Sequence, residues 1–298
     1  MESSSIGLKN CFSVTWKIEN FRYYWQHRSS VPLTSPVFSL RTLRNEELKF
    51  KLHLKKNLNW DYISYCLQRQ NDAENNREEV VLDYELSVFC SDGEFLQEKE
   101  VKGQYFQRNG ACNFFPLLSL KKALGNPLET ITVYCRLYEN KNTAVEPGHC
   151  FVRTRISVRR TSFVGILKNF SILKSECREE IRIKTNPGEN PVVSMNWSFD
   201  ELGRIFIDLF PLPEEQSNFS TCEISVLGSD GNEIKCTQDK IWYEEMKEGN
   251  VCRIKLPLTK TEVMSEESIY LKNDDLLLRF KLSFADEIEY SIYIEDSS

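Results

Sequence analysis

Hydrophobic and polar residues alternate along most of this chain, in short runs bounded by turn residues. A period of two places successive side chains on opposite faces of a strand, so each run predicts a half-buried β-strand. In the first half, strands are predicted at Phe12–Ile18, Val37–Leu40, Leu48–Leu54, Tyr62–Gln68, Val80–Cys90 and Ile131–Tyr138. In the second half they are predicted at Phe151–Val158, Phe163–Ile166, Glu180–Lys184, Val193–Phe199, Ile205–Phe210, Thr221–Leu227, Arg253–Leu256 and Leu276–Phe284. A helical turn is predicted only at Leu118–Leu124.

One strand and its turn occur twice. Glu85–Gly93 reads Glu-Leu-Ser-Val-Phe-Cys-Ser-Asp-Gly, and Glu223–Gly231 reads Glu-Ile-Ser-Val-Leu-Gly-Ser-Asp-Gly. Asp and Gly accept the backbone angles of a tight turn, so both copies predict a β-hairpin. Two further pairs of segments repeat at a similar offset: Lys17–Phe21 with Ile166–Phe170, and Thr132–Leu137 with Leu277–Leu282.

The length of the repeat predicts two domains. An offset of about 140 residues is the size of a globular domain and too long for a solenoid repeat or a propeller blade. We expect a first domain at residues 6–140 and a second, divergent domain at residues 150–296, joined by a polar linker at residues 141–149. About eight strands per domain with turn signals between them predict an all-β fold of two tandem antiparallel sandwiches.

Net charge and composition indicate which kinds of binding partner are not expected. The chain carries a formal net charge of −6, and 41% of its residues are hydrophobic. Binding of nucleic acid or of an anionic membrane depends on clustered Lys and Arg, so neither partner is expected. The first residues lack the features of a signal peptide, and no apolar run approaches the length of a membrane span. The predicted location is therefore the nucleus or the cytoplasm, not the secretory route.

The ten cysteines are scattered without a Cys-x-x-Cys pair, and several occupy apolar phases of strands. They are interpreted as reduced core residues, with no metal site and no disulfide. Histidine occurs only at His27, His53 and His149, none in a catalytic motif, and no glycine-rich phosphate loop is present. The sequence therefore predicts no enzyme, no catalytic residue and no cofactor. A cysteine hydrolase remains a remote alternative, because a thiol and a histidine could meet in space.

The opening of each half resembles a known family. Phe12–Phe21, with Trp16, Ile18, Asn20 and Phe21, is similar to the start of a MATH domain, also called the TRAF-like or meprin-and-TRAF-homology domain. Cys150–Phe170 resembles the first two strands of the speckle-type POZ and TD-and-POZ proteins, with Gly165 where the pattern has Trp. The resemblance extends over both repeats.

This resemblance implies an eight-stranded antiparallel sandwich with a shallow face that binds extended, Ser/Thr-rich peptide segments of other proteins. In the speckle-type proteins, a BTB/POZ domain follows and recruits a cullin, so that the protein is a substrate receptor of a ubiquitin ligase. No BTB/POZ pattern is present in this chain, and such a partner is implied only if the protein continues. A TRAF-type scaffold or receptor adaptor without a ligase role is the alternative.

The resemblance also implies positions for the peptide groove. In the first repeat they are His53, Cys66, Tyr84, Tyr105, Asn113 and Phe115. Aromatic rings there could bury an apolar anchor while hydroxyl groups of the peptide form hydrogen bonds. In the second repeat the same positions are Asp208, Cys222, Tyr243, Val251 and Arg253, which predict either a different ligand or a structural spacer.

Overall fold

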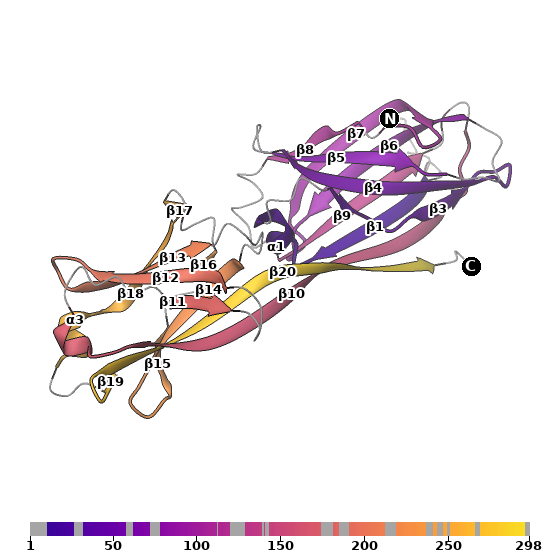
Figure 1. Ribbon diagram of the computed structural model, residues 1–298. Helices are drawn as coiled ribbons and strands as arrows, with labels where there is room; N and C mark the ends of the chain where they lie inside the picture. The colour runs from indigo at the N-terminus through magenta and orange to yellow at the C-terminus, as the bar shows by residue number, and fades with distance from the viewer. Residues whose placement is uncertain are drawn as a thin grey trace, which may run out of the picture. The chain divides into compact units, whose positions relative to one another are not determined.

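The predicted all-β class is confirmed by a computed structural model of the chain (Figure 1). The structure describes residues 11–26, 32–57, 62–71, 78–111, 113–119, 129–138, 140, 143–173, 181–184, 191–211, 219–236, 241–242, 247–248, 251–265 and 269–295. Within these ranges, helix is limited to α1 (Phe21–Gln26), α3 (Lys260–Val263) and the 3₁₀ turn η1 (Phe170–Ile172). No helix in the described part of the chain is long and apolar enough to cross a membrane.

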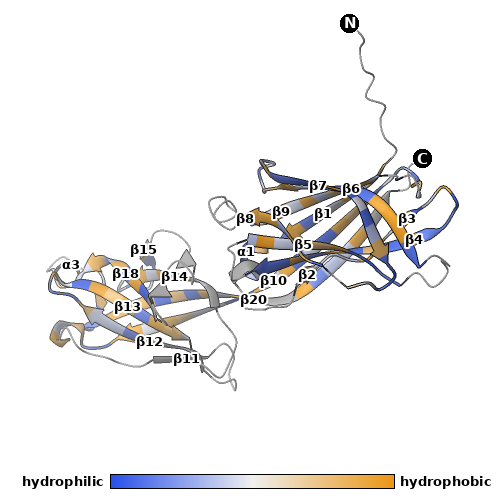
Figure 2. Ribbon diagram, turned by 90° about the horizontal axis from the view of Figure 1, so that it is seen from above, coloured by the Kyte–Doolittle hydropathy of each residue, from blue (hydrophilic) through white to orange (hydrophobic). Residues whose placement is uncertain are grey.

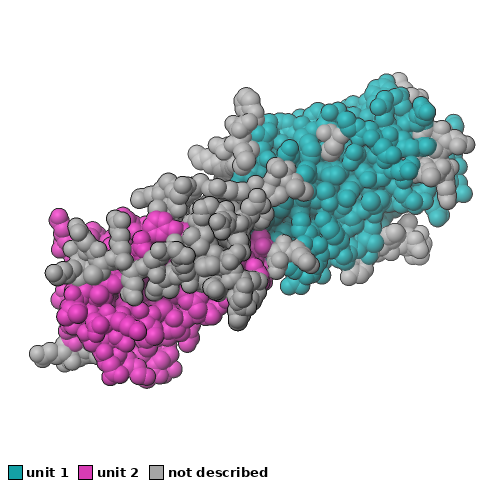
Figure 3. Space-filling model, viewed as in Figure 1, with its two compact units in different colours: residues 1–157, 287–298 teal, residues 158–286 magenta. Residues whose placement is uncertain are grey.

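The chain forms two compact units, which Figure 3 colours separately. Unit 1 consists of residues 1–157 and 287–298, and unit 2 consists of residues 158–286. Two long strands, β10 (Gly148–Leu167) and β20 (Asp275–Glu295), contribute residues to both units. The boundary between the units therefore lies inside β10, later in the chain than the predicted linker at 141–149.

Residues from the predicted linker pack into unit 1. Val145 is fully buried and forms a β-bridge with Thr42. Next to it, the N–H of Leu43 donates to the carbonyl of Ala144 at 3.0 Å. An apolar side chain and a paired backbone fix this segment, because neither is favourable when exposed. We infer that the described residues around Val145 are part of the unit 1 fold.

Unit 1 is built from two sheets. The first follows the order β20-β10-β1-β9-β6-β7, and the second follows β2-β4-β5-β8 with β3 paired to β4. The strands confined to this unit are β1 (Cys11–Glu19), β2 (Leu33–Thr34), β3 (Phe38–Arg41), β4 (Glu47–Asn57), β5 (Tyr62–Arg69), β6 (Glu79–Phe89), β7 (Phe95–Gln107), β8 (Phe115–Ser119) and β9 (Thr130–Tyr138). On β4, Leu48, Phe50, Leu52 and Leu54 are buried and alternate with more exposed residues, as the sequence predicts. Figure 2 shows this alternation as changes between orange and blue along the strands.

Strand β8 corrects the predicted helical turn at Leu118–Leu124. Leu118 and Ser119 belong to β8, which pairs antiparallel with β5. The rest of the predicted turn lies outside the described residues. Leu117 and Leu118 are adjacent and both buried, so the local pattern does not alternate and the period of a strand is hidden.

Strand β10 joins the first sheet of unit 1 by pairing with β1 in parallel, whereas the other described pairs in this unit are antiparallel. The prediction of two strands at Phe151–Val158 and Phe163–Ile166 was wrong, because β10 is continuous through both. On the core face, the indole N–H of Trp16 donates to the hydroxyl of Thr154 at 2.9 Å. Both residues are fully buried, so this bond satisfies a polar group that water cannot reach.

We expect Thr154→Val to lower the free energy of unfolding by about 1–3 kcal/mol, because it leaves the buried indole N–H of Trp16 without its acceptor. Valine has nearly the shape of threonine, so the loss would reflect the hydrogen bond and not a cavity. Urea unfolding followed by tryptophan fluorescence would measure it. Thr132→Val, on the more exposed face of β9, is the control; an equal effect there would contradict the assignment.

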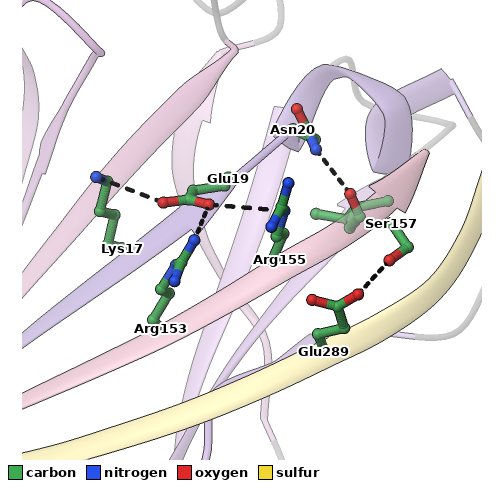
Figure 4. Close-up of polar contacts among 8 residues, drawn as sticks. Lys17, Glu19, Asn20, Arg153, Arg155, Ser157 and Glu289 are labelled. Carbon is green, nitrogen blue, oxygen red and sulfur yellow. Dashed lines mark hydrogen bonds and ion pairs between the residues drawn. The ribbon is translucent and has the colours of Figure 1, made fainter.

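A polar cluster links β1, β10 and β20 on the opposite face of the sheet (Figure 4). The carboxylate of Glu19 accepts a hydrogen bond from Arg153, and the Lys17 amine lies 3.5 Å away. The hydrogen bond from Arg153 holds the pKa of Glu19 below its usual value. The hydroxyl of Ser157 donates to Glu289, which brings the last part of β20 against β10. These contacts are partly exposed, so they orient the strands more than they stabilise them.

Unit 2 also consists of two sheets. One follows the order β15-β14-β20-β10 with β16 paired to β14 and β19 to β20, and the other follows β11-β12-β13-β18-β17. The strands confined to this unit are β11 (Ile181–Lys184), β12 (Pro191–Phe199), β13 (Arg204–Pro211), β14 (Phe219–Leu227), β15 (Glu233–Cys236), β16 (Ile241–Trp242), β17 (Lys247–Glu248), β18 (Val251–Thr259) and β19 (Leu271–Lys272). In its core, Phe280 stacks on Phe163 with ring centroids 4.9 Å apart and lies against Gly165.

The repeated Asn-Phe motif has the same geometry in both units. Asn20 and Asn169 adopt left-handed backbone angles, with φ of 57° and 49°. The phenylalanine that follows each of them is fully buried. Asparagine tolerates this conformation better than most residues, which allows the chain to turn sharply and insert the next side chain into the core. The motif therefore ends a strand and anchors the following segment.

The two repeated Ser-Asp-Gly turns form the same hydrogen bond. Asp92 accepts from the N–H of residue 94, and Asp230 accepts from the N–H of residue 232, both at 2.9 Å. Gly93 and Gly231 both have φ of 84°, which a residue with a side chain rarely adopts. Each aspartate thus closes its own hairpin turn, as the sequence predicts.

Candidate functional site

A small hollow opens in unit 1 where strand β8 stops pairing with β5. Among the described residues, strand β8 pairs with β5 along Tyr62–Tyr65. Beyond that point, Cys66–Arg69 of β5 forms one wall of the hollow, and Gln104–Gln107 of β7 forms another. Five of the predicted groove residues line it: Cys66, Tyr84, Tyr105, Asn113 and Phe115. The structure therefore brings together residues that are far apart in the sequence.

Tyr84 forms the floor of the hollow. Its side chain is 2% exposed, and its hydroxyl lies 3.4 Å from that of Tyr65. Burial raises the pKa of Tyr84 well above its usual value, so the phenol stays neutral and able to donate a hydrogen bond. Its ring packs on Phe106, with centroids 6.0 Å apart. Tyr84 is thus a core residue whose surface reaches the hollow, and not an exposed groove aromatic.

Phe115 and Tyr105 form the rim. Phe115 is 39% exposed, and its ring lies 6.0 Å from that of Tyr65. Tyr105 is 67% exposed, which is unusual for a large aromatic side chain on a strand. A bulge in β7 near Gly103 accompanies this exposure: the N–H of Gly103 donates to Asp83 at 2.7 Å, and the register with β6 shifts there. Two rings are therefore available to a ligand.

Amide groups make the rest of the lining polar. Gln68 donates from Nε2 to the carbonyl of Gly110 at 2.8 Å, which holds Gly110, another lining residue, against β5. Gln104 and Gln107 lie on the opposite side. Arg69 is buried and donates to the carbonyl of Glu78 at 3.3 Å. The described lining contains one guanidinium and no carboxylate, so it suits neutral or acidic groups better than basic ones.

His53 does not line the hollow, although the sequence predicts it at the groove. It lies on β4 opposite Cys66, with its Nε2 3.0 Å from the Oε1 of Gln68. Burial, together with the charge of Lys51, lowers the pKa of His53, so the ring is neutral near pH 7. Its edge packs against Phe114 at 6.5 Å. His53 therefore positions Gln68 and has no direct contact with the hollow.

Cys66 corrects the expectation of ten free thiols. It is buried and disulfide-bonded, and the sulfur to which it is joined lies outside the described residues. The free thiols among the described cysteines are Cys11, Cys90, Cys135, Cys150 and Cys222. Sequence spacing did not reveal the bond, because no Cys-x-x-Cys or similar pattern marks it.

No second-repeat position that the structure describes carries an exposed aromatic ring of the kind that Tyr105 and Phe115 provide. Arg253 on β18 donates two hydrogen bonds to Asp208 on the neighbouring strand β13. Nε donates to Oδ1 at 2.7 Å, and Nη2 donates to Oδ2 at 2.9 Å. Cys222 is fully buried in the core at the position that matches Tyr84. Val251 is the first residue of β18, and Tyr243 lies outside the described residues. Of the positions whose side chains the structure describes, Asp208 and Arg253 pair with each other and Cys222 fills the core.

The amide side chains of Gln68, Gln104 and Gln107 line the hollow, although the sequence pattern did not predict them as site residues. Glutamine in a polar phase of a strand usually faces water, and only the end of β8 shows that this stretch borders an opening. No protein-family model and no curated protein matches this chain, so the functional assignment depends on the geometry of the hollow.

Proposed function

We propose that the chain is a peptide-binding adaptor of the MATH type, which holds an extended segment of a partner protein at the hollow of unit 1. The observation that carries the proposal is a hollow lined by Cys66–Arg69 of β5 and by the exposed rings of Tyr105 and Phe115. An extended peptide can lie across such a hollow and place one side chain between the rings. The rings of Tyr105 and Phe115 would bury an apolar residue at low entropic cost.

The size of the hollow limits the ligand. Its volume is about 60 Å³, whereas sites for cofactors and drug-sized molecules measure roughly 300 Å³ or more. One small side chain fits inside, so the rest of the ligand would lie across the surface. The amides of Gln104, Gln107 and Asn113 are suited to hydroxyl groups and peptide bonds. These features support a Ser/Thr-rich segment with one apolar anchor.

The chemistry of the thiols supports a binding role over the cysteine-hydrolase alternative. A nucleophilic cysteine needs a lowered pKa, because the thiolate is the reactive form. Burial raises the pKa of Cys135 and Cys90, and it raises the pKa of Cys150 to about 11. These thiols are poor nucleophiles at neutral pH.

We place this adaptor in the nucleus or cytoplasm, as a substrate-recognition part of a BTB-cullin ubiquitin ligase. A TRAF-type scaffold is the second candidate, and the Asp208–Arg253 pair in unit 2 favours a structural role for that unit in either case. Affinity purification separates the two roles: recovery of a cullin and a BTB/POZ protein supports the ligase role, and recovery of receptor tails alone supports the scaffold.

We expect Phe115→Ala and Tyr105→Ala each to weaken peptide capture by about five- to thirtyfold, which corresponds to roughly 1–2 kcal/mol. Each substitution removes an exposed ring from the rim of the hollow. Fluorescence anisotropy with short, labelled Ser/Thr-rich peptides that carry one apolar residue would measure the affinity. Tyr105→Ala should leave thermal stability almost unchanged, because its side chain is 67% exposed.

Phe95→Ala is the matched control, because Phe95 is 52% exposed on β7 and does not line the hollow. It should bind the peptide as the unmodified protein does. Equal losses for Phe95 and Tyr105 would show that the hollow is not the binding site. Capture that is unchanged in all three variants would exclude peptide binding at this rim.

A further inference from the structure

Unit 2 has a recess that is larger than the hollow of unit 1. Its volume is about 790 Å³, within the range of roughly 300–1,000 Å³ that is usual for ligand sites. The recess lies between the turn that joins β12 to β13, residues 200–203, and the segment 260–265, which contains α3. Asp208 and Arg253 do not line it. The recess is therefore separate from the groove positions that the sequence predicted in this unit.

Phe199 is the buried residue of the lining. It is 8% exposed, and its ring meets the rings of Phe170 and Trp197 edge to face, with centroids 5.7 and 5.5 Å away. The amine of Lys260 lies 5.2 Å from the centre of the Phe199 ring and donates a hydrogen bond to the carbonyl of Leu173. A cation above an aromatic face is attracted to it. The ammonium group in the lining is thus held by groups of the protein itself.

Hydrogen bonds fix the two walls of the recess. The Oδ1 of Asp200 accepts from the N–H of Leu202 at 3.0 Å and from the N–H of Arg204 at 2.8 Å, which closes the turn between β12 and β13. The N–H of Lys260 donates to the carbonyl of Gly203 at 2.7 Å and joins this turn to the start of α3. A recess that is formed before the ligand arrives loses little conformational entropy on binding.

The rim combines apolar side chains with negative charge. Leu202 is 70% exposed and Met264 is 40% exposed. The charged residues of the lining are Asp200, Glu201 and Lys260, two carboxylates and one amine, and the whole chain carries a formal net charge of −6. Exposed apolar groups next to carboxylates suit a ligand that is apolar and positively charged.

The exposure of the rim favours a segment of a larger partner over a free small molecule. Small-molecule sites enclose most of the ligand surface, whereas a peptide segment leaves its outer side in water. We propose that the recess of unit 2 binds a basic, apolar peptide segment of a partner protein. An apolar side chain of the segment packs against Leu202 and Met264, and a Lys or Arg side chain lies at the carboxylate of Glu201. This second site does not depend on the peptide-binding function of unit 1.

The test titrates the full chain, isotope-labelled at its methionine methyl groups, with the peptide Gly-Leu-Arg-Leu-Arg-Gly. The chain has four methionines, which gives a simple methyl NMR spectrum. We expect the Met264 signal to shift until it saturates, because Met264 lines the recess. The Met195 signal should not move, because that side chain is 2% exposed in the core. The peptide Gly-Leu-Glu-Leu-Glu-Gly should shift neither signal.

Two variants test the contacts. Glu201→Lys should weaken binding of the arginine peptide by about tenfold or more, because it reverses the charge at the rim. Leu202→Ala should weaken it by about fivefold through the loss of an apolar contact. Glu100→Lys is the matched control, because it changes the net charge by the same amount at a side chain that is 63% exposed on β7 of unit 1. This control should bind within about twofold of the unmodified protein.

The other outcomes would overturn the proposal. A Met264 signal that stays in place with the arginine peptide, or that moves equally with the glutamate peptide, would exclude a basic segment here. Equal losses in Glu201→Lys and Glu100→Lys would show attraction by net charge alone. Octylamine that binds as tightly as the peptide would assign the recess to a small molecule, and a Met264 shift that depends on protein concentration without peptide would assign it to a second copy of the chain.

Discussion

We expect Val152→Asp to unfold unit 1, with a loss of more than about 4 kcal/mol in the free energy of unfolding. Val152 is fully buried on β10 and lies opposite Trp16 in the parallel pair with β1. A carboxylate there would lose its water without gaining a partner. Hydrogen exchange resolved by segment would show the loss of protection in β1, which pairs with β10, and in β9, which pairs with β1.

Val164→Asp is the matched control on the same strand. Val164 is 47% exposed, so its replacement by aspartate should change stability by no more than about 0.5 kcal/mol. The Val152→Asp variant also tests where the boundary between the two units lies. If Val152→Asp removed protection from residues of unit 2 and left unit 1 intact, the start of β10 would belong to the second domain, as the sequence repeat predicts.

We expect Gly165→Trp to destabilise unit 2 by about 3 kcal/mol or more. The family pattern has Trp at this position, but a Cβ atom on Gly165 would lie only 2.9 Å from the ring of Phe280. That ring is held by its stack on Phe163 and cannot move aside without disturbing the core. Chemical unfolding with segment-resolved hydrogen exchange would show the effect in residues 158–286 and not in β1.

A double-mutant cycle with Phe280→Ala tests the cause. If the two side chains compete for one space, the double variant will be less destabilised than the sum of the single variants. Additive losses, or a stable Gly165→Trp variant, would show that the space beside Gly165 is not filled by Phe280. The result also bears on the resemblance, because it tests whether unit 2 has repacked around the missing indole.

The strands and turns could be predicted from the sequence because they depend on local signals. Alternation identified β4 and its buried leucines, and the repeated Ser-Asp-Gly identified both hairpin turns. The pairing of β1 with β10 could not be predicted in this way. Alternation shows which face of a strand is buried, but not which strand lies beside it. The domain boundary inside β10 was hidden for the same reason.

The candidate site was predictable where a family resemblance supplied positions. It placed Tyr84, Tyr105 and Phe115 around one opening, although it did not distinguish the buried floor from the exposed rim. That distinction depends on the bulge at Gly103 and on the end of β8, which are properties of pairing. The disulfide at Cys66 belongs to no Cys-x-x-Cys or similar pattern, so sequence spacing carries no trace of it.

The route of the chain has a consequence for synthesis on the ribosome. Unit 1 begins at the N-terminal side of the chain but is not complete until residues 287–298 have been made, after all of unit 2. Domains usually fold in the order in which they emerge. Here the strands from β1 to the first half of β10 could assemble early, whereas the last half of β20 can dock on unit 1 only at the end. Its contacts there, such as Tyr290 with Thr34 at 3.5 Å, are exposed and close the fold as a final, reversible step.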